Sequence, residues 1–186
     1  PEQFIPVAEE IGIIIPLGEW VVEQACEQAA LWPDDIKVAV NVSSVQFRSP
    51  RLIDAFSRAL GRSKLSPGRL ELEITESVLL ANSAETLATL HKLRALGLRI
   101  ALDDFGTGYS SLSYLRSFPF DKLKIDQSFV RDLTATEGSK LIIRAIVSLG
   151  KSLGMRTTAE GVQTVAQLNQ VAAEGCDEIQ GSFLSK

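Results

Sequence analysis

The chain has 186 residues, of which 45% are hydrophobic and 23% charged, as expected for a globular protein with a buried core. Its 19 basic and 23 acidic side chains give a net charge of −4 without a basic stripe, so we expect no nucleic-acid polymer as partner. The apolar runs are too short to span a bilayer, and two distant cysteines, Cys26 and Cys176, favour a reducing cytoplasm over a disulfide or zinc site.

Apolar runs typical of β-strands alternate with helical patterns along the chain. The expected strands cover 37–42, 70–75, 98–103, 122–125, 155–159 and 178–179. The expected helices cover 4–11, 19–32, 52–62, 82–96, 139–153 and 164–174. This alternation indicates one α/β domain with a parallel sheet, either an open doubly-wound sheet or a closed (β/α)8 barrel. The usual Gly-rich dinucleotide and phosphate loops do not follow the strands, which weakens the first alternative.

Four of the expected strands carry polar residues near their carboxyl ends, where a buried parallel strand is normally apolar. These residues are Asn41, Glu73, Asp103 with Asp104 after it, and Lys124. Because strand side chains alternate between faces, the polar ones point away from the covering helices, which in a barrel means towards the interior. The carboxyl ends of the strands are also where barrel enzymes have their active sites.

A group of charges at one shielded edge costs roughly several kcal/mol per ion unless it is compensated. Mg²⁺ or Mn²⁺ would neutralise the carboxylates, because an all-oxygen ligand set suits these hard ions. Each residue taken alone has a structural alternative: a turn or cap for Asn41, an ion pair for Glu73 or Lys124, and a polar turn for Asp103–Asp104. Their coincidence at equivalent strand ends favours a functional site.

Three further polar residues follow expected strands. Glu76 comes three residues after Glu73, Glu160 precedes Gly161, and Gln180 precedes Gly181. Glu76 fits a cap of the next turn or a contact that holds the nearby loop, and Glu160 fits an active-site rim or a helix-start role. Gln180 fits a hydrogen bond to a ligand or to the backbone. Glycines after Asp104 permit positive φ and close approach of a ligand in the segment 103–111, although a Gly-rich turn is a weak signal by itself.

Several motifs, in this order, resemble those of the EAL domain family, which comprises bacterial cyclic-di-GMP phosphodiesterases with a modified TIM barrel. The matching segments are Phe4-Ile5-Pro6, Asn41-Val42-Ser43, Glu73-Ile74-Thr75-Glu76, the string DDFGTGYSSL at 103–112, Lys124-Ile125-Asp126, Ala159-Glu160-Gly161-Val162 and Gln180-Gly181. The resemblance extends over essentially the whole chain, and the long string makes it specific.

The resemblance implies a two-metal hydrolysis, in which Mg²⁺ or Mn²⁺ activates a water that opens one phosphodiester bond of cyclic di-GMP and leaves linear pGpG. By motif, Lys124 positions the water or assists in catalysis, and Glu160 is a ligand or general-base contributor. Glu76 stabilises the loop that contains Phe105 and Gly106, a loop that takes part in metal binding and dimerisation in the family. Gln180 corresponds to a glutamine on the substrate or water side. The metal ligands implied by motif are Asn41, Glu73, Asp103 and Asp104.

Two departures from the family pattern stand out. The Glu-Ala-Leu motif is absent, and its strand is expected upstream of Pro1; the glutamate that commonly follows Gly161-Val162 is replaced by Gln163. A full barrel needs about 250 residues. We therefore expect residues 1–186 to be an EAL domain truncated at the N-terminus and at the C-terminus, an incomplete barrel of about six strands with weak or no activity alone.

For the parent protein we expect a cytoplasmic phosphodiesterase domain that forms a homodimer and is accompanied by sensory or GGDEF domains, with a membrane anchor possible elsewhere. The alternative is a catalytically inactive EAL domain that acts as a cyclic-di-GMP receptor or a protein-interaction module. The acidic motifs and Lys124 are all retained, which favours the enzyme.

Overall fold

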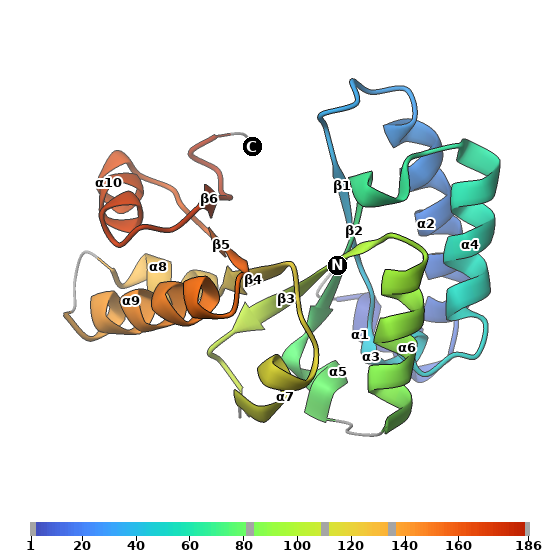
Figure 1. Cartoon of the computed structure of the whole chain (residues 1–186), viewed down its shortest axis with the longest axis horizontal. Helices are drawn as coiled ribbons and strands as arrows, with labels where there is room; N and C mark the ends of the chain where they lie inside the picture. Colours follow the sequence, from blue (N-terminus) through green and yellow to red (C-terminus); the bar gives the residue numbers. More distant parts are fainter. Residues whose placement is uncertain (1–2, 81–83, 109–111, 134–136, 185–186) are drawn as a thin grey trace. The chain divides into compact units, whose positions relative to one another are not determined.

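The computed structural model describes residues 3–80, 84–108, 112–133 and 137–184, which fold into two compact units, Pro1–Ile100 and Ala101–Lys186. The described residues form six strands: β1 (Val38–Asn41), β2 (Leu70–Thr75), β3 (Arg99–Phe105), β4 (Lys122–Ile125), β5 (Arg156–Ala159) and β6 (Glu178–Ile179) (Figure 1). Every expected strand is therefore confirmed, with ends that differ by at most two residues. No described helix is long and apolar enough to cross a membrane.

The helices of the first unit are α1 (Ile5–Glu10), α2 (Ile14–Ala29), α3 (Ser44–Phe47), α4 (Leu52–Ser63), the 3₁₀ helix η1 (Pro67–Arg69), α5 (Glu76–Leu80) and α6 (Ala84–Ala95). Those of the second unit are α7 (Leu112–Ser117), α8 (Gln127–Arg131), α9 (Glu137–Ser152) and α10 (Val165–Ala173). Helix α2 begins five residues before the expected start. The expected start of α6 at Asn82 lies outside the described residues.

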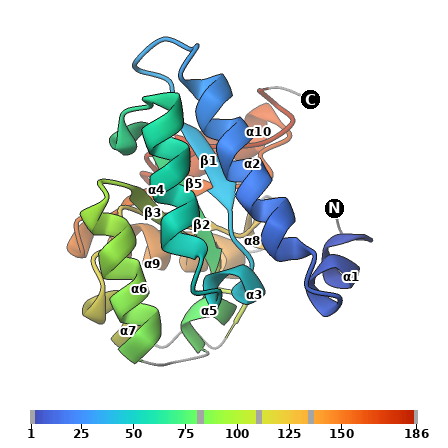
Figure 2. The same ribbon diagram turned by 90° about the vertical axis from the view of Figure 1, so that its right-hand side faces the viewer.

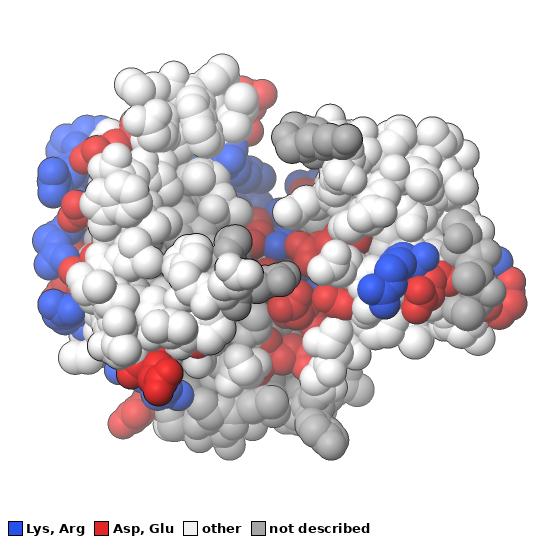
Figure 3. All heavy atoms as spheres, turned by 180° about the vertical axis from the view of Figure 1, so that it is seen from behind, with Lys and Arg blue, Asp and Glu red and all other residues white. Residues whose placement is uncertain are grey.

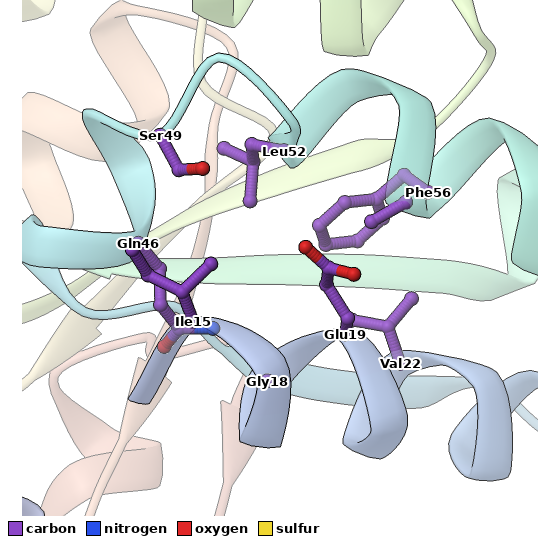
Figure 4. A pocket seen from close by; sticks show the side chains of 9 residues that line it. Ile15, Gly18, Glu19, Val22, Gln46, Ser49, Leu52 and Phe56 are labelled. Carbon is purple, nitrogen blue, oxygen red and sulfur yellow. The ribbon is translucent and has the colours of Figure 1, made fainter. Parts of the chain in front are cut away.

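The first unit is built on the parallel pair β1 and β2, in which Val38 is opposite Leu70 and Asn41 is opposite Glu73. Helices α2 and α4 lie side by side over this pair (Figures 1 and 2). Helix α2 also lies close to α3, because a Cβ at Gly18 would overlap the side-chain amide of Gln46. Figure 4 shows the Gln46 side chain against α2.

The guanidinium group of Arg69 fastens the α2–β1 connection to the start of β2. It donates hydrogen bonds to the backbone oxygens of Ile36 at 2.8 Å and Ala29 at 2.8 Å, and only 8% of the residue is exposed. Further acceptors are the backbone oxygens of Pro33 and Trp32 and the carboxylate of Asp34. The buried charge is thus solvated by the protein backbone.

An ion-pair ladder runs along the exposed side of the α2–α4 contact. Arg51 and Arg58 of the α4 segment reach Glu19 of α2 at 3.2 and 3.4 Å. Arg62 reaches Glu23 and Glu27 at 3.4 and 3.7 Å. Figure 3 shows the basic and acidic side chains alternating along this edge. All three arginines are more than half exposed, so each pair contributes little to stability.

The second unit contains the parallel strands β3, β4, β5 and β6, paired in chain order, and the first two residues of β3 belong to the first unit. Helix α9 packs along β4 and β5 through buried Ile143 and Val147, with Gly150 close to Thr157. Arg144 of α9 forms a two-pronged ion pair with Glu174 after α10, at 2.7 and 3.0 Å. These helices cover the face opposite to the polar residues of the strands.

Candidate active site

A β-bulge in β3 brings the two adjacent aspartates to the same place. Leu102 is opposite Leu123 and Phe105 is opposite Ile125, so three steps along β3 correspond to two along β4. Asp104 takes up the extra residue with a left-handed backbone, φ +52°, which costs roughly 1 kcal/mol for a residue with a Cβ. The strict alternation of side chains is interrupted there, so that Asp103 and Asp104 both contribute to one cluster.

Lys124 lies at the centre of this cluster with 3% of its surface exposed. Its Nζ lies 3.0 Å from Oδ1 of Asp103 and 2.6 Å from Oε1 of Glu160. Glu160 directly follows β5 and is held there because its backbone N–H donates to the oxygen of Ile125 at 3.1 Å. The structure therefore gathers four of the predicted site residues, three carboxylates and the lysine, at the carboxyl ends of β3, β4 and β5.

The three carboxylates are arranged as a potential cation site. One oxygen from each of Asp103, Asp104 and Glu160 lies within 4.8 Å of the others. Burial raises the pKa of the Asp104 carboxyl, the charges of Asp103 and Asp126 raise it further, and Lys124 lowers it in part. The cluster thus carries more negative charge than its surroundings readily stabilise. Oxygen donors with an excess of negative charge fit a hard divalent cation such as Mg²⁺ or Mn²⁺.

Asp126 belongs to the surroundings of this cluster and was not among the predicted site residues. Its carboxylate accepts a hydrogen bond from the backbone N–H of Ser128 at 2.9 Å and thereby caps α8, and its charge is among the causes that raise the pKa of the Asp104 carboxyl. The sequence did contain a signal, because Asp126 comes two residues after Lys124 at the same strand end. The motif Lys124-Ile125-Asp126 contains it, but the motif alone assigns it no role.

The loop after Asp104 is fixed by packing. Phe105 is buried, and Gly106 has φ +101°, so that a Cβ there would come within 2.8 Å of the ring of Phe129 in α8. The Thr107 hydroxyl donates to the backbone oxygen of Asp104 at 2.9 Å. Phe105 and Gly106 therefore support the bulge rather than form part of the cluster. Tyr109, Ser110 and Ser111 of the same motif lie outside the described residues.

In the first unit, Asn41 and Glu73 are neighbours at the carboxyl ends of β1 and β2. They are opposite each other in the parallel register and share one face of the pair. Glu73 is 6% exposed, whereas Asn41 is exposed. The capping role considered for Asn41 belongs to Ser43, whose hydroxyl accepts from the N–H of Gln46 at 3.3 Å in a capping box that begins α3.

The two remaining predicted site residues lie at the ends of elements. Glu76 is the first residue of α5 and is buried. Gln180 follows β6 and is exposed, and its backbone N–H donates to the oxygen of Ala159 at 2.9 Å, next to Glu160. Gly181 is required after it, since a Cβ would overlap the backbone of Val162. The roles of both side chains stay predictions.

Comparison with known proteins identifies the class to which this fold and cluster belong. The model of the EAL domain family matches residues 1–186, and the chain is a member of that family. It is 43% identical over 190 residues to the bifunctional diguanylate cyclase/cyclic di-GMP phosphodiesterase MucR of Pseudomonas aeruginosa, covering 100% of this chain and 28% of MucR. It is 38% identical over 189 residues to the cyclic di-GMP phosphodiesterase PdeR of Escherichia coli, with 100% and 29% covered. The chain thus spans less than a third of either relative.

Solved structures agree with this assignment. The chain is similar to the phosphodiesterase of PaMucR in complex with c-di-GMP, with a TM-score of 0.96 and 43% identity over 100% of this chain and 77% of the other. It is also similar to the FimX EAL domain of Xanthomonas citri in complex with c-diGMP, with a TM-score of 0.91 and 26% identity over 100% and 75%. The prediction of an EAL-type (β/α)8 barrel represented by about six strands is confirmed.

Proposed function

We propose that this protein hydrolyses cyclic di-GMP to linear pGpG in bacterial second-messenger signalling and that the reaction depends on Mg²⁺ or Mn²⁺ in a two-metal site. The observation that carries the proposal is the cluster of Asp103, Asp104, Lys124 and Glu160 at adjacent strand ends. The names of MucR and PdeR, which describe cyclic di-GMP phosphodiesterases, support the choice of substrate.

The residues that would hold the ions are all oxygen donors, namely Asn41 and Glu73 of the first unit and Asp103 and Asp104 of the second, where Glu160 lies beside the two aspartates. A divalent ion bound there supplies a Lewis acid for the phosphodiester and lowers the pKa of a water. The excess of negative charge around Asp104 and the all-oxygen donor set support this assignment.

Lys124 and Glu160 have complementary tasks in the proposed reaction. The ammonium of Lys124 fixes Asp103 and Glu160 relative to each other and places positive charge beside the position where the phosphoryl group would carry negative charge. Glu160 can accept the proton of the attacking water, because its carboxylate lies at the edge of the cluster and is partly accessible. Glu76 would stabilise the loop after the bulge, and Gln180 would contact substrate or water.

The direct experiment measures the formation of pGpG from cyclic di-GMP by the intact protein, with Mg²⁺, with Mn²⁺ and with a chelator. We expect product only with a divalent ion and a loss of at least a hundredfold for Glu73→Ala. Glu85→Ala, which changes an exposed glutamate of α6, is the matched control and should retain full activity. Turnover in the presence of chelator would contradict the proposal.

A second candidate function is a receptor that binds cyclic di-GMP without hydrolysis. The solved structures of PaMucR and FimX hold c-di-GMP in complex, which supports binding of this ligand by a member of the family, and binding alone does not require hydrolysis. A calorimetric titration with cyclic di-GMP together with the turnover assay distinguishes the two. Binding without pGpG would identify a receptor, and the presence of Glu-Ala-Leu upstream of Pro1 would favour the enzyme.

For the whole protein we propose a homodimer in the cytoplasm in which further domains, sensory or GGDEF, regulate the phosphodiesterase. The name of MucR supports this for a relative, because it describes a cyclase and a phosphodiesterase in one protein. Analytical ultracentrifugation of the intact protein with and without cyclic di-GMP tests the dimer.

A further inference from the structure

A second lysine shares the face of β4 that carries Lys124. Lys122 comes two residues earlier, so its Cα lies about 7 Å nearer the amino end of the strand and its side chain points to the same face. Among its contacts is the carboxylate of Glu178, with Nζ 2.9 Å from Oε2. The unit therefore contains two ammonium groups in consecutive rows of one sheet face.

The row nearer the carboxyl ends of the strands, here called the upper row, contains Lys124, Thr158 and Glu178, and the lower row contains Lys122 and Arg156. The carboxylate of Glu178 points towards the lower row. In the parallel register Glu178 is opposite Thr158, and Thr158 is opposite Lys124. Nevertheless its carboxylate lies 2.8 Å from Nη1 of Arg156, which is the register partner of Lys122. This side chain thus turns away from the row of the acidic cluster.

Thr158 keeps the Glu178 carboxylate in that position. Its buried hydroxyl donates to Oε2 of Glu178 at 3.1 Å. Burial raises the pKa of Glu178, but the hydrogen bonds and charges of Lys122, Thr158 and Arg156 outweigh it and leave the pKa below its ordinary value. Glu178 is therefore an anion at neutral pH, matched to the two cations below the cluster.

Each of the two rows of this sheet face has its own group of ion pairs. In the upper row the Lys124 ammonium contacts Asp103 and Glu160, and in the lower row Lys122 and Arg156 contact Glu178. Asp103 lies two residues after Ala101, which is opposite Lys122, so one row separates it from the second lysine. A four-carbon side chain is flexible and long enough to turn to the next row when its acid is removed.

We propose that Glu178 is a positioning residue of the phosphodiesterase site. By holding Lys122 in the lower row, Glu178 keeps a second ammonium away from Asp103 and Glu160, so that these carboxylates remain available to a divalent cation. This inference rests on the proposed function, and it concerns the affinity for the ion rather than the chemical step.

The test is the binding of Mn²⁺ to the intact protein, followed by the electron paramagnetic resonance signal of the free ion. Binding by the wild type and its turnover of cyclic di-GMP establish the proposed function separately. We expect Glu178→Gln to bind Mn²⁺ about tenfold more weakly, because a closer ammonium opposes the cation. The double variant Lys122→Met/Glu178→Gln should regain wild-type affinity within about twofold, since the competing charge is gone.

Glu174→Gln is the matched control, because it breaks the exposed pair with Arg144 in the same unit and should leave Mn²⁺ affinity unchanged. Wild-type affinity in Glu178→Gln, or a double variant as weak as the single one, would overturn the proposal. If Glu178→Gln does not fold, Lys122→Met decides the question. Unchanged or tighter Mn²⁺ binding supports the proposal, and binding at least fivefold weaker overturns it.

Discussion

Each unit of this molecule contains a buried cation, and the two differ in what surrounds them. Arg69 of the first unit donates to four backbone oxygens and to Asp34, at the junction between helix α2 and the strands. Lys124 of the second unit contacts the carboxylates of Asp103 and Glu160. Backbone oxygens are fixed and carry no net charge, whereas carboxylates carry charge that another cation can share.

This difference separates a structural charge from a functional one. The surroundings of Arg69 satisfy its donors and leave little to gain from another partner. The surroundings of Lys124 include more acids than cations; burial first, and then the charges of Asp103 and Asp126, raise the pKa of Asp104, which also has a strained left-handed backbone. Strain and unbalanced charge that persist at the same strand end are characteristic of a site under functional constraint.

Lys124→Met should give the largest effect and should act on activity. We expect pGpG formation to fall by about a thousandfold, since the variant loses both the positive charge and the contact that orders Asp103 and Glu160. Steady-state assays of the folded variant measure this. Lys140→Met, at a lysine that pairs with Glu137 on α9, is the control and should be fully active. A loss of less than tenfold in Lys124→Met would contradict the functional role that we assign to this lysine.

Arg69→Met should act on stability instead. We expect the free energy of unfolding of the first unit to fall by about 3 kcal/mol, because the buried carbonyl of Ala29 and the part-buried carbonyls of Pro33 and Ile36 lose their donor together. Urea denaturation followed by circular dichroism measures the change. The remaining folded protein should turn over cyclic di-GMP within twofold of the wild type. A stable but inactive Arg69→Met protein would show that the two cations are not separable in this way.

Cys26 gives a smaller effect that depends on pH. Burial raises the pKa of this thiol to about 11, and the charge of Glu27 adds to the effect. The native state thus retains a proton that the unfolded chain loses near pH 9, so stability falls as the pH rises from about 9 to about 11. Between pH 8 and pH 10 we expect the wild type to lose about 1 kcal/mol more than Cys26→Ala. Urea denaturation at both pH values measures this, and an equal loss of stability in the wild type and in Cys26→Ala would contradict the prediction.

Arg62→Ala should have the smallest effect. Its contacts with Glu23 and Glu27 are long and mostly exposed. We therefore expect the free energy of unfolding to change by less than about 0.5 kcal/mol and the activity to stay the same. The same denaturation experiment, repeated at high salt, measures it. A change near that of Arg69→Met would mean that exposed charges on α2 and α4 contribute as much as a buried one.

The elements and the positions of the acids could be predicted from the sequence, because buried strands have a recognisable composition and polar residues interrupt it at Glu73 and Asp103. The bulge could not be predicted. Alternation places Asp103 and Asp104 on opposite faces, and only the register with β4 shows that β3 contains an extra residue. The ion pairs of Lys124 likewise depend on strands that meet only in the folded sheet.

Arg69 shows a second limit. In the sequence it stands in a turn between Gly68 and Leu70, and its acceptors lie 33 to 40 residues away, so no local pattern predicts its burial. Short helices such as α3, α5 and α8 were also missed, because four or five residues do not establish a helical period.

The central claim is that the bulged aspartates and Glu160 hold a divalent ion beside Lys124, and that this site hydrolyses cyclic di-GMP. The most direct measurement is the rate of pGpG formation across a Mn²⁺ titration for the wild type and Asp104→Asn. We predict no product without the ion, saturation of the wild type, and at least tenfold more Mn²⁺ for half-maximal rate in the variant. Equal titration curves, or product in the presence of chelator, would contradict the claim.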